Sequence, residues 1–317
     1  MYDIIGDVHG HASLLKKLLK VLGYEKTLNG YSHPERRVIF VGDFINRGPE
    51  IKQTVEIIRS IVESGNGTAI LGNHELNAIL YFLKDESGTV LKRKSSQMKM
   101  PLVRTLEQFA FDHEALKSHI KWFRTLPLFF ESHDLRVVHA CWNQSSIELL
   151  KSTFHGSRIK RSVLRSAMKN PLISRALETS LKGMELIMPN DLILRDSHGI
   201  NHRMFRIKWW ESPVGKTFRE ISFGNKFLLP NYTVPQEILT DIEEYSTDNS
   251  PVFFGHYCLQ QPPIIRPNLC CVDSCVVNTG TLTAYRWDGE KKLDPRKIVW
   301  VKNGSVLKDQ KDYIYIA

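Results

Sequence analysis

Apolar runs alternate with amphipathic segments over roughly the first quarter of the chain. Three runs that end on glycine and polar residues are typical of buried strands: residues 1–6 (MYDIIG), 36–43 (RRVIFVGD) and 68–73 (TAILGN). Three segments carry apolar side chains at helical spacing: residues 12–23, 50–65 and 75–83. This alternation predicts parallel strands with helices packed on the faces of their sheet.

The pattern changes after Leu83. Residues 84–101 are polar and basic and predict a loop, residues 101–125 predict helix, and residues 135–142 (LRVVHACW) predict a buried strand. A basic, partly helical insertion is expected at about 145–205. Four apolar runs follow and turn quickly, which predicts a second, more antiparallel sheet: residues 251–256, 269–274, 282–289 and 297–304.

The composition is that of a soluble globular protein, with 42% apolar and 24% charged residues in 317. No apolar stretch reaches about 18 residues, so no membrane partner is expected. The N-terminus lacks the pattern of a signal peptide, which predicts a cytoplasmic protein. The net charge of +9 favours anionic partners, but no nucleic-acid recognition motif is present.

Five cysteines, an odd number, lie without paired C-x-x-C spacing: Cys141, Cys258, Cys270, Cys271 and Cys275. A structural zinc site or a disulfide framework is therefore not expected, and the thiols should be reduced. Cys270 and Cys271, on an apolar run, should lie in the core.

Five apolar runs end on residues able to bind a metal ion. In chain order these residues are Asp7 and His9, Asp43, Asn73 and His74, His139, and His256. Loops at the carboxyl ends of strands converge, so the side chains are expected to meet. Carboxylate and amide oxygens mixed with imidazoles suit Mn²⁺, Fe or Zn²⁺. Six ligands drawn from these seven residues exceed the needs of one open catalytic ion and fit two ions about 3.5–4 Å apart.

These residues stand in motifs that resemble the calcineurin-like metallophosphoesterases. The motifs are GDVHG at 6–10, GDFINRG at 42–48, GNHE at 72–75, His139, and GH at 255–256. They are most similar to the branch with PPP-type Ser/Thr protein phosphatases and symmetrical diadenosine tetraphosphate hydrolases. The resemblance implies a four-layer α/β/β/α sandwich, with residues 1–317 as a single domain that carries the insertion at 145–205 and the loop at 84–101.

The resemblance also implies a role for each site residue. Asp7, His9 and Asp43 would hold one ion, and Asp43, Asn73, His139 and His256 the other, so that Asp43 bridges them. A hydroxide between the ions would attack phosphorus. Arg47 and Asn73 would contact the phosphate, and His74 would protonate the leaving oxygen. We expect Mn²⁺, with Fe, Zn²⁺ and Mg²⁺ as alternatives. Glu75 and Asp273 are expected to be structural.

Two features depart from the pattern or leave a choice. The family has Asp where this chain has Asn46, which can orient His74 but supplies no negative charge. We expect weaker acid catalysis, which favours leaving groups that need little protonation. A second phosphate-binding arginine is expected at Arg219, with Arg206 as the competitor. Trp209 and Trp210 could stack on a nucleotide base, but packing in the smaller sheet is the preferred interpretation.

The main functional prediction is a phosphatase similar to the Ser/Thr protein phosphatases. The alternative is a symmetrical dinucleoside polyphosphate hydrolase, and the second alternative is an inactive metal-binding interaction module. The substrate would be a phosphoprotein or a nucleotide. An insertion that roofs the metals would favour small nucleotides, and one that leaves a groove would favour phosphopeptides.

Overall fold

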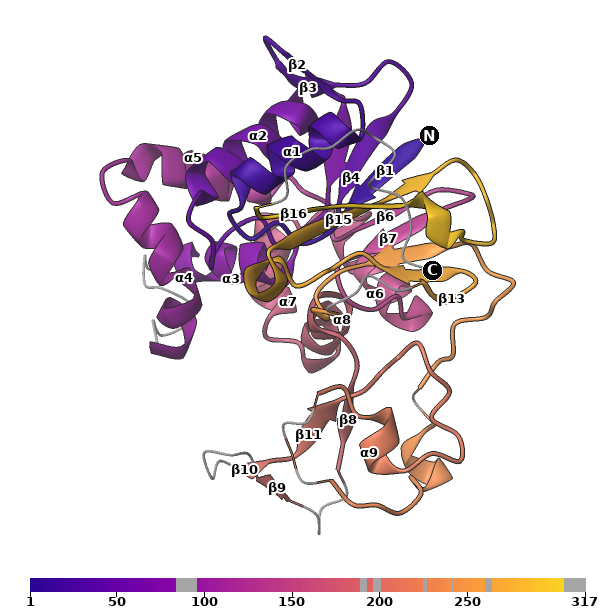
Figure 1. Cartoon of the computed structure of the whole chain (residues 1–317). Coiled ribbons are helices and arrows are strands. Elements are labelled where there is room, and N and C mark those ends of the chain that lie inside the picture. Colours follow the sequence, from indigo (N-terminus) through magenta and orange to yellow (C-terminus); the bar gives the residue numbers. More distant parts are fainter. Residues whose placement is uncertain are drawn as a thin grey trace.

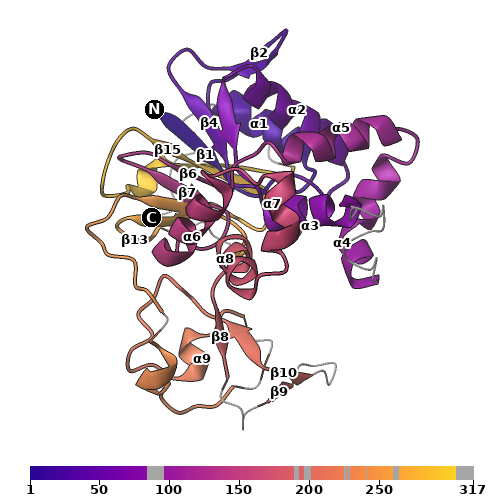
Figure 2. The same ribbon diagram turned by 180° about the vertical axis from the view of Figure 1, so that it is seen from behind.

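Two five-stranded sheets pack face to face, and helices cover the outer face of each (Figures 1 and 2). This is the predicted four-layer α/β/β/α sandwich. The structure, a computed structural model, describes residues 1–83, 96–188, 193–195, 201–224, 227, 229–240, 242–259 and 264–304.

The first sheet has the strand order β16-β15-β1-β4-β5. Its strands are, in that order, Ile298–Lys302, Thr281–Trp287, Tyr2–Ile5, Arg37–Phe40 and Gly67–Ala69. β1, β4 and β5 run parallel, as predicted, and β15 and β16 add antiparallel strands beyond β1. The carboxyl ends of β1, β4 and β5 therefore lie at one edge of the sheet.

The second sheet has the order β13-β14-β12-β7-β6. Its strands are, in that order, Ile264–Arg266, Leu269–Cys271, Val252–Phe254, Arg136–Val138 and Phe129–Glu131. β7, β12 and β14 run parallel. The prediction that the four C-terminal runs together form a second, more antiparallel sheet is wrong, because two of them join β7 in parallel and two extend the first sheet. Alternating apolar positions identify a strand but not its partner.

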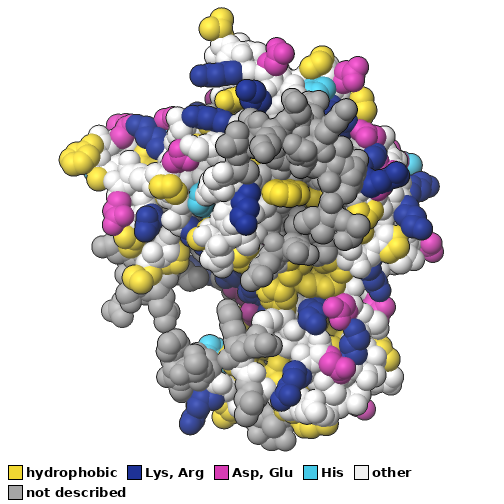
Figure 3. Space-filling model, viewed as in Figure 1, with side chains coloured by type: hydrophobic (Ala, Val, Ile, Leu, Met, Phe, Trp, Pro, Cys, Tyr) yellow, Lys and Arg dark blue, Asp and Glu magenta, His cyan; other side chains and the backbone are white. Residues whose placement is uncertain are grey.

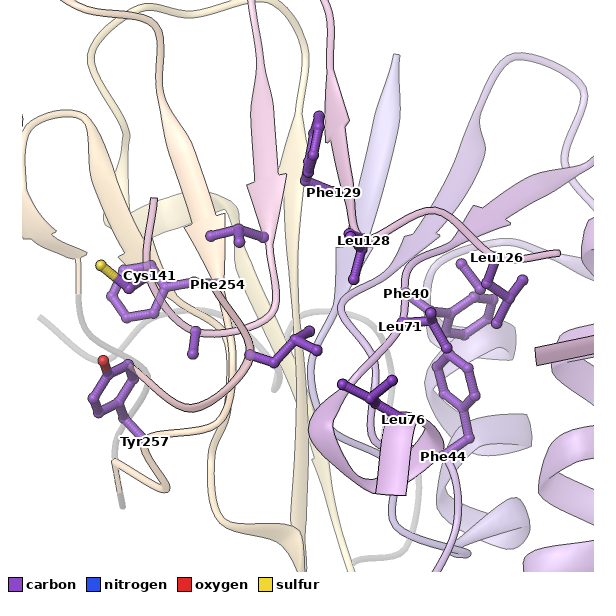
Figure 4. Packing of buried hydrophobic residues seen from close by; sticks show 14 of the residues in the cluster. Phe40, Phe44, Leu71, Leu76, Leu126, Leu128, Phe129, Cys141, Phe254 and Tyr257 are labelled. Atoms are coloured by element: carbon purple, nitrogen blue, oxygen red, sulfur yellow. The ribbon is translucent and has the colours of Figure 1, made fainter. Parts of the chain in front are cut away.

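The space between the sheets is filled by apolar side chains from both. They are, among others, Ile4, Ile39, Val41, Ile70, Val137, Phe253 and Tyr285. A larger cluster fills the spaces between the sheets and the helices, and Figure 4 shows Phe40 and Phe44 in one part of it and Phe254 and Tyr257 in another. Burial of each such side chain stabilises the fold by about 1.5–3 kcal/mol. This packing fixes the position of each sheet relative to the other.

Helices α1 to α5 belong to the half of the molecule with the first sheet, and α6 to α8 to the half with the second (Figure 1). Their bounds are Ala12–Val21, Ile51–Glu63, Asn73–Phe82, Ser96–Gln108, His113–Phe123, Gln144–Phe154, Arg161–Ala167 and Pro171–Lys182. The predicted helix at 101–125 is two helices, because Asp112 caps α5 by accepting the N–H of Ala115. The predicted loop at 84–101 ends in α4, and residues 84–95 lie outside the described residues.

In the described residues, the small lobe below the sandwich in Figure 1 contains short elements. They are β8 (Glu185–Ile187) paired with β11 (Met204–Arg206), β9 (Leu194–Arg195) paired with β10 (Asn201–His202), α9 (Phe218–Ile221) and the 3₁₀ turn Gln236–Ile238. The predicted insertion at 145–205 is thus helical only in its first part. No helix in the described ranges has the length and apolar character needed to span a bilayer.

Four further short elements complete the described chain: the hairpin of β2 (Glu25–Thr27) and β3 (Gly30–Ser32), α10 (Val276–Thr279) and the 3₁₀ turn Pro295–Lys297. Cys258 and Cys275, in the loops after β12 and β14, form a disulfide. The expectation that all thiols are reduced is wrong for this pair, because the fold brings together two loops whose sequence spacing gives no signal. Cys270 and Cys271 are buried, as predicted.

Candidate metal centre

The predicted metal ligands come from both sheets and meet at the carboxyl ends of their strands. Asp7 and His9 follow β1, Asp43 follows β4, and Asn73 is the first residue of α3, after β5. His139 follows β7 and His256 follows β12, both in the second sheet. The face-to-face packing of the sheets is therefore what assembles the site.

Asp43 lies between two groups of possible ligands. Its Oδ2 is 3.6 Å from Nε2 of His9, and its Oδ1 is 3.4 Å from Nε2 of His139. One group, whose possible ligand atoms all lie within 4.8 Å of one another, joins His9, Asp43 and His74, and a second joins Asp43, His139 and His256. A carboxylate that belongs to both groups can bridge two ions.

Asn73 and Asp7 complete the centre. Oδ1 of Asn73 lies 3.0 Å from Nε2 of His139 and 3.0 Å from Nδ1 of His256, so three side chains face one point. The carboxylate of Asp7 accepts the backbone N–H of His256 at 3.1 Å. The structure thus brings all six predicted ligands together.

The backbone around the centre is unusually tight. A Cβ on Gly255 would lie 2.0 Å from Oδ1 of Asp7, and one on Gly72 would lie 2.2 Å from Oδ1 of Asp43. His9, Asp43 and His256 have positive φ angles of 42°, 54° and 70°. Left-handed conformations of non-glycine residues concentrate at functional sites, where the surrounding structure holds them in place.

The charges of the centre favour cations. Burial raises the pKa of Asp7 well above its usual value, and the neighbouring Asp273 raises it further. Burial lowers the pKa of His139, but the carboxylates of Asp43 and Asp7 and the carbonyl oxygen of Val41 together outweigh burial and raise the pKa to about 10. Two buried carboxylates flanked by imidazoles are stable when positive charge accompanies them. The donor set of oxygen and nitrogen atoms fits two divalent ions.

Glu75 holds the backbone of Asp43 in place. Its carboxylate accepts the backbone N–H groups of Asp43 at 2.8 Å, Phe44 at 2.9 Å and Gly72 at 3.1 Å. Asp273 is similar, because it accepts the N–H groups of Cys258 at 2.7 Å and Cys275 at 2.8 Å. Both residues play the structural part predicted for them.

His74 belongs to the first of the two groups of possible ligands, and it also contacts Asn46. Its Nδ1 is 2.5 Å from Nδ2 of Asn46, and its Nε2 is 3.8 Å from Oδ2 of Asp43. Burial lowers the pKa of His74, although Asp43 acts in the opposite direction. The positive charge of Arg47 lowers the pKa of both His74 and His9, which puts this exposed arginine beside the centre.

Of the two candidate arginines in the lobe, Arg206 is at the centre. Nη1 of Arg206 donates to Nε2 of His256 at 2.9 Å, and its Nη2 lies 3.8 Å from Oε1 of Glu185 on the neighbouring strand. Arg219 is exposed on α9 and, within the described chain, has no hydrogen bond or ion pair with a predicted ligand. The tryptophans that follow β11 are buried against Phe254, as predicted: Trp209 and Trp210.

Thr105 on α4 is a site residue that sequence reasoning missed. Its hydroxyl contacts Asn46, at 2.5 Å from Oδ1. A single threonine in an amphipathic helix gives no signal, and only the folded structure shows that α4 lies against the loop of Asn46.

The model of the family described as calcineurin-like phosphoesterase matches residues 2–218. The protein therefore belongs to the calcineurin-like phosphoesterases, and it is a metal-dependent phosphoric ester hydrolase. This agrees with the resemblance of its motifs and with the two groups of ligands around Asp43.

Several curated relatives are bis(5'-nucleosyl)-tetraphosphatases. The symmetrical enzyme of Bordetella pertussis strain Tohama I is 27% identical over 318 residues, which cover 94% of each chain. The symmetrical enzyme of Marinomonas sp. strain MWYL1 is 24% identical and covers 92% of this chain and 94% of its own. The asymmetrical PrpE enzyme of Geobacillus sp. strain WCH70 is 45% identical over 82 residues, and the match spans only 34% of its length.

Among solved structures, the cold-active protein-tyrosine phosphatase of a psychrophilic Shewanella species has the same fold. It superimposes with a TM-score of 0.50 at 14% identity, over 90% of this chain and 75% of its own. At that identity the likeness concerns the fold alone.

Proposed function

We propose that this phosphoesterase hydrolyses dinucleoside polyphosphates, and that it cleaves them symmetrically. The relatives that align with more than nine-tenths of this chain carry the name symmetrical bis(5'-nucleosyl)-tetraphosphatase. The asymmetrical relatives with higher identity match about a quarter of it. Within the site, the observation that carries the proposal is the contact between Asn46 and His74.

The uncharged Asn46 suits a phosphoanhydride better than an alkyl phosphate. Asp at this position would stabilise a protonated His74, whereas an amide adds no charge. Cleavage of a dinucleoside tetraphosphate at its centre releases a nucleoside diphosphate, whose terminal phosphate is stable as an anion near neutral pH. A serine or threonine alkoxide is far more basic and must receive a proton as it leaves.

The remaining residues have separate tasks. Asp7, His9 and Asp43 would hold one divalent ion, and Asp43, Asn73, His139 and His256 the other, with Mn²⁺ as the expected metal. Such ions acidify water and neutralise phosphate charge. Arg47 and Arg206, which flank the ligands, bind the non-bridging phosphate oxygens through their planar guanidinium groups. His74 donates a hydrogen bond to the leaving oxygen.

The two other functions considered from the sequence have less support. A Ser/Thr protein phosphatase needs an acid for alkoxide leaving groups, and the partner of His74 is uncharged. An inactive module has no need for Arg47 and His74 beside a full set of ligands. The Lys and Arg side chains on the face in Figure 3 are dispersed rather than gathered in one patch, which gives no support to a nucleic-acid partner.

The test is a comparison of kcat/KM on four substrates with Mn²⁺ added. They are diadenosine tetraphosphate, diadenosine triphosphate, p-nitrophenyl phosphate and a phosphoserine peptide. We expect diadenosine tetraphosphate to give the highest value and to yield ADP alone. A preference for the phosphoserine peptide would overturn the proposal, and products of AMP and ATP would overturn symmetrical cleavage.

A further inference from the structure

Helix α4 holds the loop that carries Asn46 and Arg47 through two side chains. Oγ1 of Thr105 donates to Oδ1 of Asn46 at 2.5 Å and accepts the backbone N–H of Asn46 at 3.2 Å. Nearly one turn further along the helix, Gln108 accepts the N–H of Ile51 at 2.7 Å and donates to the carbonyl oxygen of Gly48 at 3.1 Å. Thr105 therefore contacts Asn46, which in turn contacts His74.

The contacts of the Thr105 hydroxyl fix which end of the Asn46 amide faces His74. Thr105 and Asn46 are both buried, with 2% and 0% of their surface exposed, so their polar atoms need partners within the protein. The hydroxyl oxygen of Thr105 accepts the backbone N–H of Asn46, and the hydroxyl hydrogen is donated to Oδ1 of Asn46. A reversed amide would take this acceptor away. Nδ2 therefore faces Nδ1 of His74.

This orientation determines where the imidazole carries its hydrogen. An amide nitrogen is only a donor, so Nδ1 of His74 has to accept. In a neutral ring the hydrogen is then on Nε2, the nitrogen on the side of Asp43 and the metal ligands. Three side chains in series, Thr105, Asn46 and His74, thus present one N–H group to the reaction site.

On the basis of the proposed function, we propose that Thr105 is a positioning residue that orients the Asn46 amide and so keeps the ring hydrogen of His74 on Nε2. In the reaction a hydroxide oxygen bonds to phosphorus, and the bond to the leaving oxygen breaks. That oxygen keeps the electron pair and accepts a hydrogen bond from Nε2, while His74 keeps its proton. The arrangement selects leaving groups that are stable as anions, namely phosphoanhydrides and aryl phosphates.

Thr105→Val removes the hydroxyl at nearly constant shape, and Thr105→Ser retains it. Thr283→Val is a matched control, because Thr283 is also fully buried and its hydroxyl has no hydrogen-bond partner in the described structure. Thr105→Val should lower kcat for diadenosine tetraphosphate about tenfold, since His74 acts in the transition state. KM should stay within about twofold. A loosened loop would instead displace Arg47 and raise KM.

Thr105→Ser should restore kcat, and Thr283→Val should match the wild type. The tautomer of His74 gives a readout that does not depend on activity. Ring ¹⁵N signals of the protein loaded with diamagnetic Zn²⁺ should show the hydrogen of His74 on Nε2 in the wild type and in Thr105→Ser, but not in Thr105→Val.

Two results would overturn the role of Thr105. One is an unchanged tautomer in Thr105→Val, and the other is a loss of kcat that Thr105→Ser does not restore. Failure of the proposed function looks different: the wild type would then leave diadenosine tetraphosphate intact, while the ring signals would still report on Thr105.

Discussion

Asp43 and His139 follow strands of different sheets, and yet Nε2 of His139 lies 3.4 Å from Oδ1 of Asp43. Glu75 also fixes the loop that carries Asp43, because its carboxylate accepts the backbone N–H groups of Asp43 and Phe44. The centre is therefore a product of sheet packing, and it forms only when both halves of the sandwich are folded.

Replacing Asn46 by Asp should make His74 a stronger source of a proton for the leaving oxygen. A carboxylate beside His74 stabilises the protonated ring. We expect kcat for an alkyl phosphate to rise by about tenfold or more, and kcat for p-nitrophenyl phosphate to change much less. Steady-state kinetics on both substrates checks this, with Asn66→Asp, a change at a half-buried position in the turn after α2, as the control. Equal gains on both substrates would count against the role assigned to Asn46.

Arg206 and Arg219 are distinguished by paired substitutions. Arg206 contacts His256, whereas Arg219 is exposed on α9. Arg206→Ala should raise KM and lower kcat together, with a loss in kcat/KM of about a hundredfold, since a bidentate contact to phosphate is lost. Arg219→Ala should stay within about twofold of the wild type. If Arg219→Ala is the damaging change, the arginine expected from the sequence is the phosphate ligand after all.

His119 on α5 should make the fold sensitive to acid. Burial lowers its pKa to about 4, and nearby Arg59 and Lys52 act in the same direction. The folded protein thus keeps His119 neutral, while the unfolded chain takes up a proton below about pH 6.5. The stability that depends on neutral His119 is complete above pH 6.5 and is lost as the pH falls toward 4.

Urea unfolding in EDTA at pH 7 and pH 5 tests this. His119→Gln should lose less free energy of unfolding between the two values than the wild type. His133→Gln, at an exposed histidine, should behave as the wild type does. An equal loss in His119→Gln and the wild type would exclude His119 as the cause.

The disulfide predicts how many thiols react. Denatured protein without reductant should expose three thiols, those of Cys141, Cys270 and Cys271, and five after reduction. The double variant Cys258→Ser/Cys275→Ser should give three in both conditions. Reduction should lower the free energy of unfolding by about 2–4 kcal/mol, because the cross-link restricts the unfolded chain. Five reactive thiols in the unreduced protein would contradict the pairing.

The sequence was sufficient for the parts of the site that are local in the chain. Asp7, Asp43 and Asn73 each follow an apolar strand, and strand ends converge by a general rule of α/β sheets. It was not sufficient for contacts between distant elements. The approach of Thr105 to Asn46, and the choice of Arg206 over Arg219 at His256, depend on how α4 and the lobe pack, and no local pattern encodes them.

The same distinction holds for the fold. The first three strand–helix units were predicted correctly, because their periodicity is regular. The C-terminal strands were recognised, but their sheet was not, since β15 pairs with β1 at the opposite end of the chain. Pairing at that distance is decided by which edge of a sheet is free.

We propose that Asp43 joins two metal ions in one centre. The most direct measurement is the electron paramagnetic resonance spectrum of the protein loaded with Mn²⁺, together with its metal content. We predict two ions per chain with the spectrum of an exchange-coupled pair at about 3.5–4 Å, and at most one uncoupled ion in Asp43→Asn. Two ions with the spectrum of isolated Mn²⁺, or an unchanged coupled pair in Asp43→Asn, would contradict it.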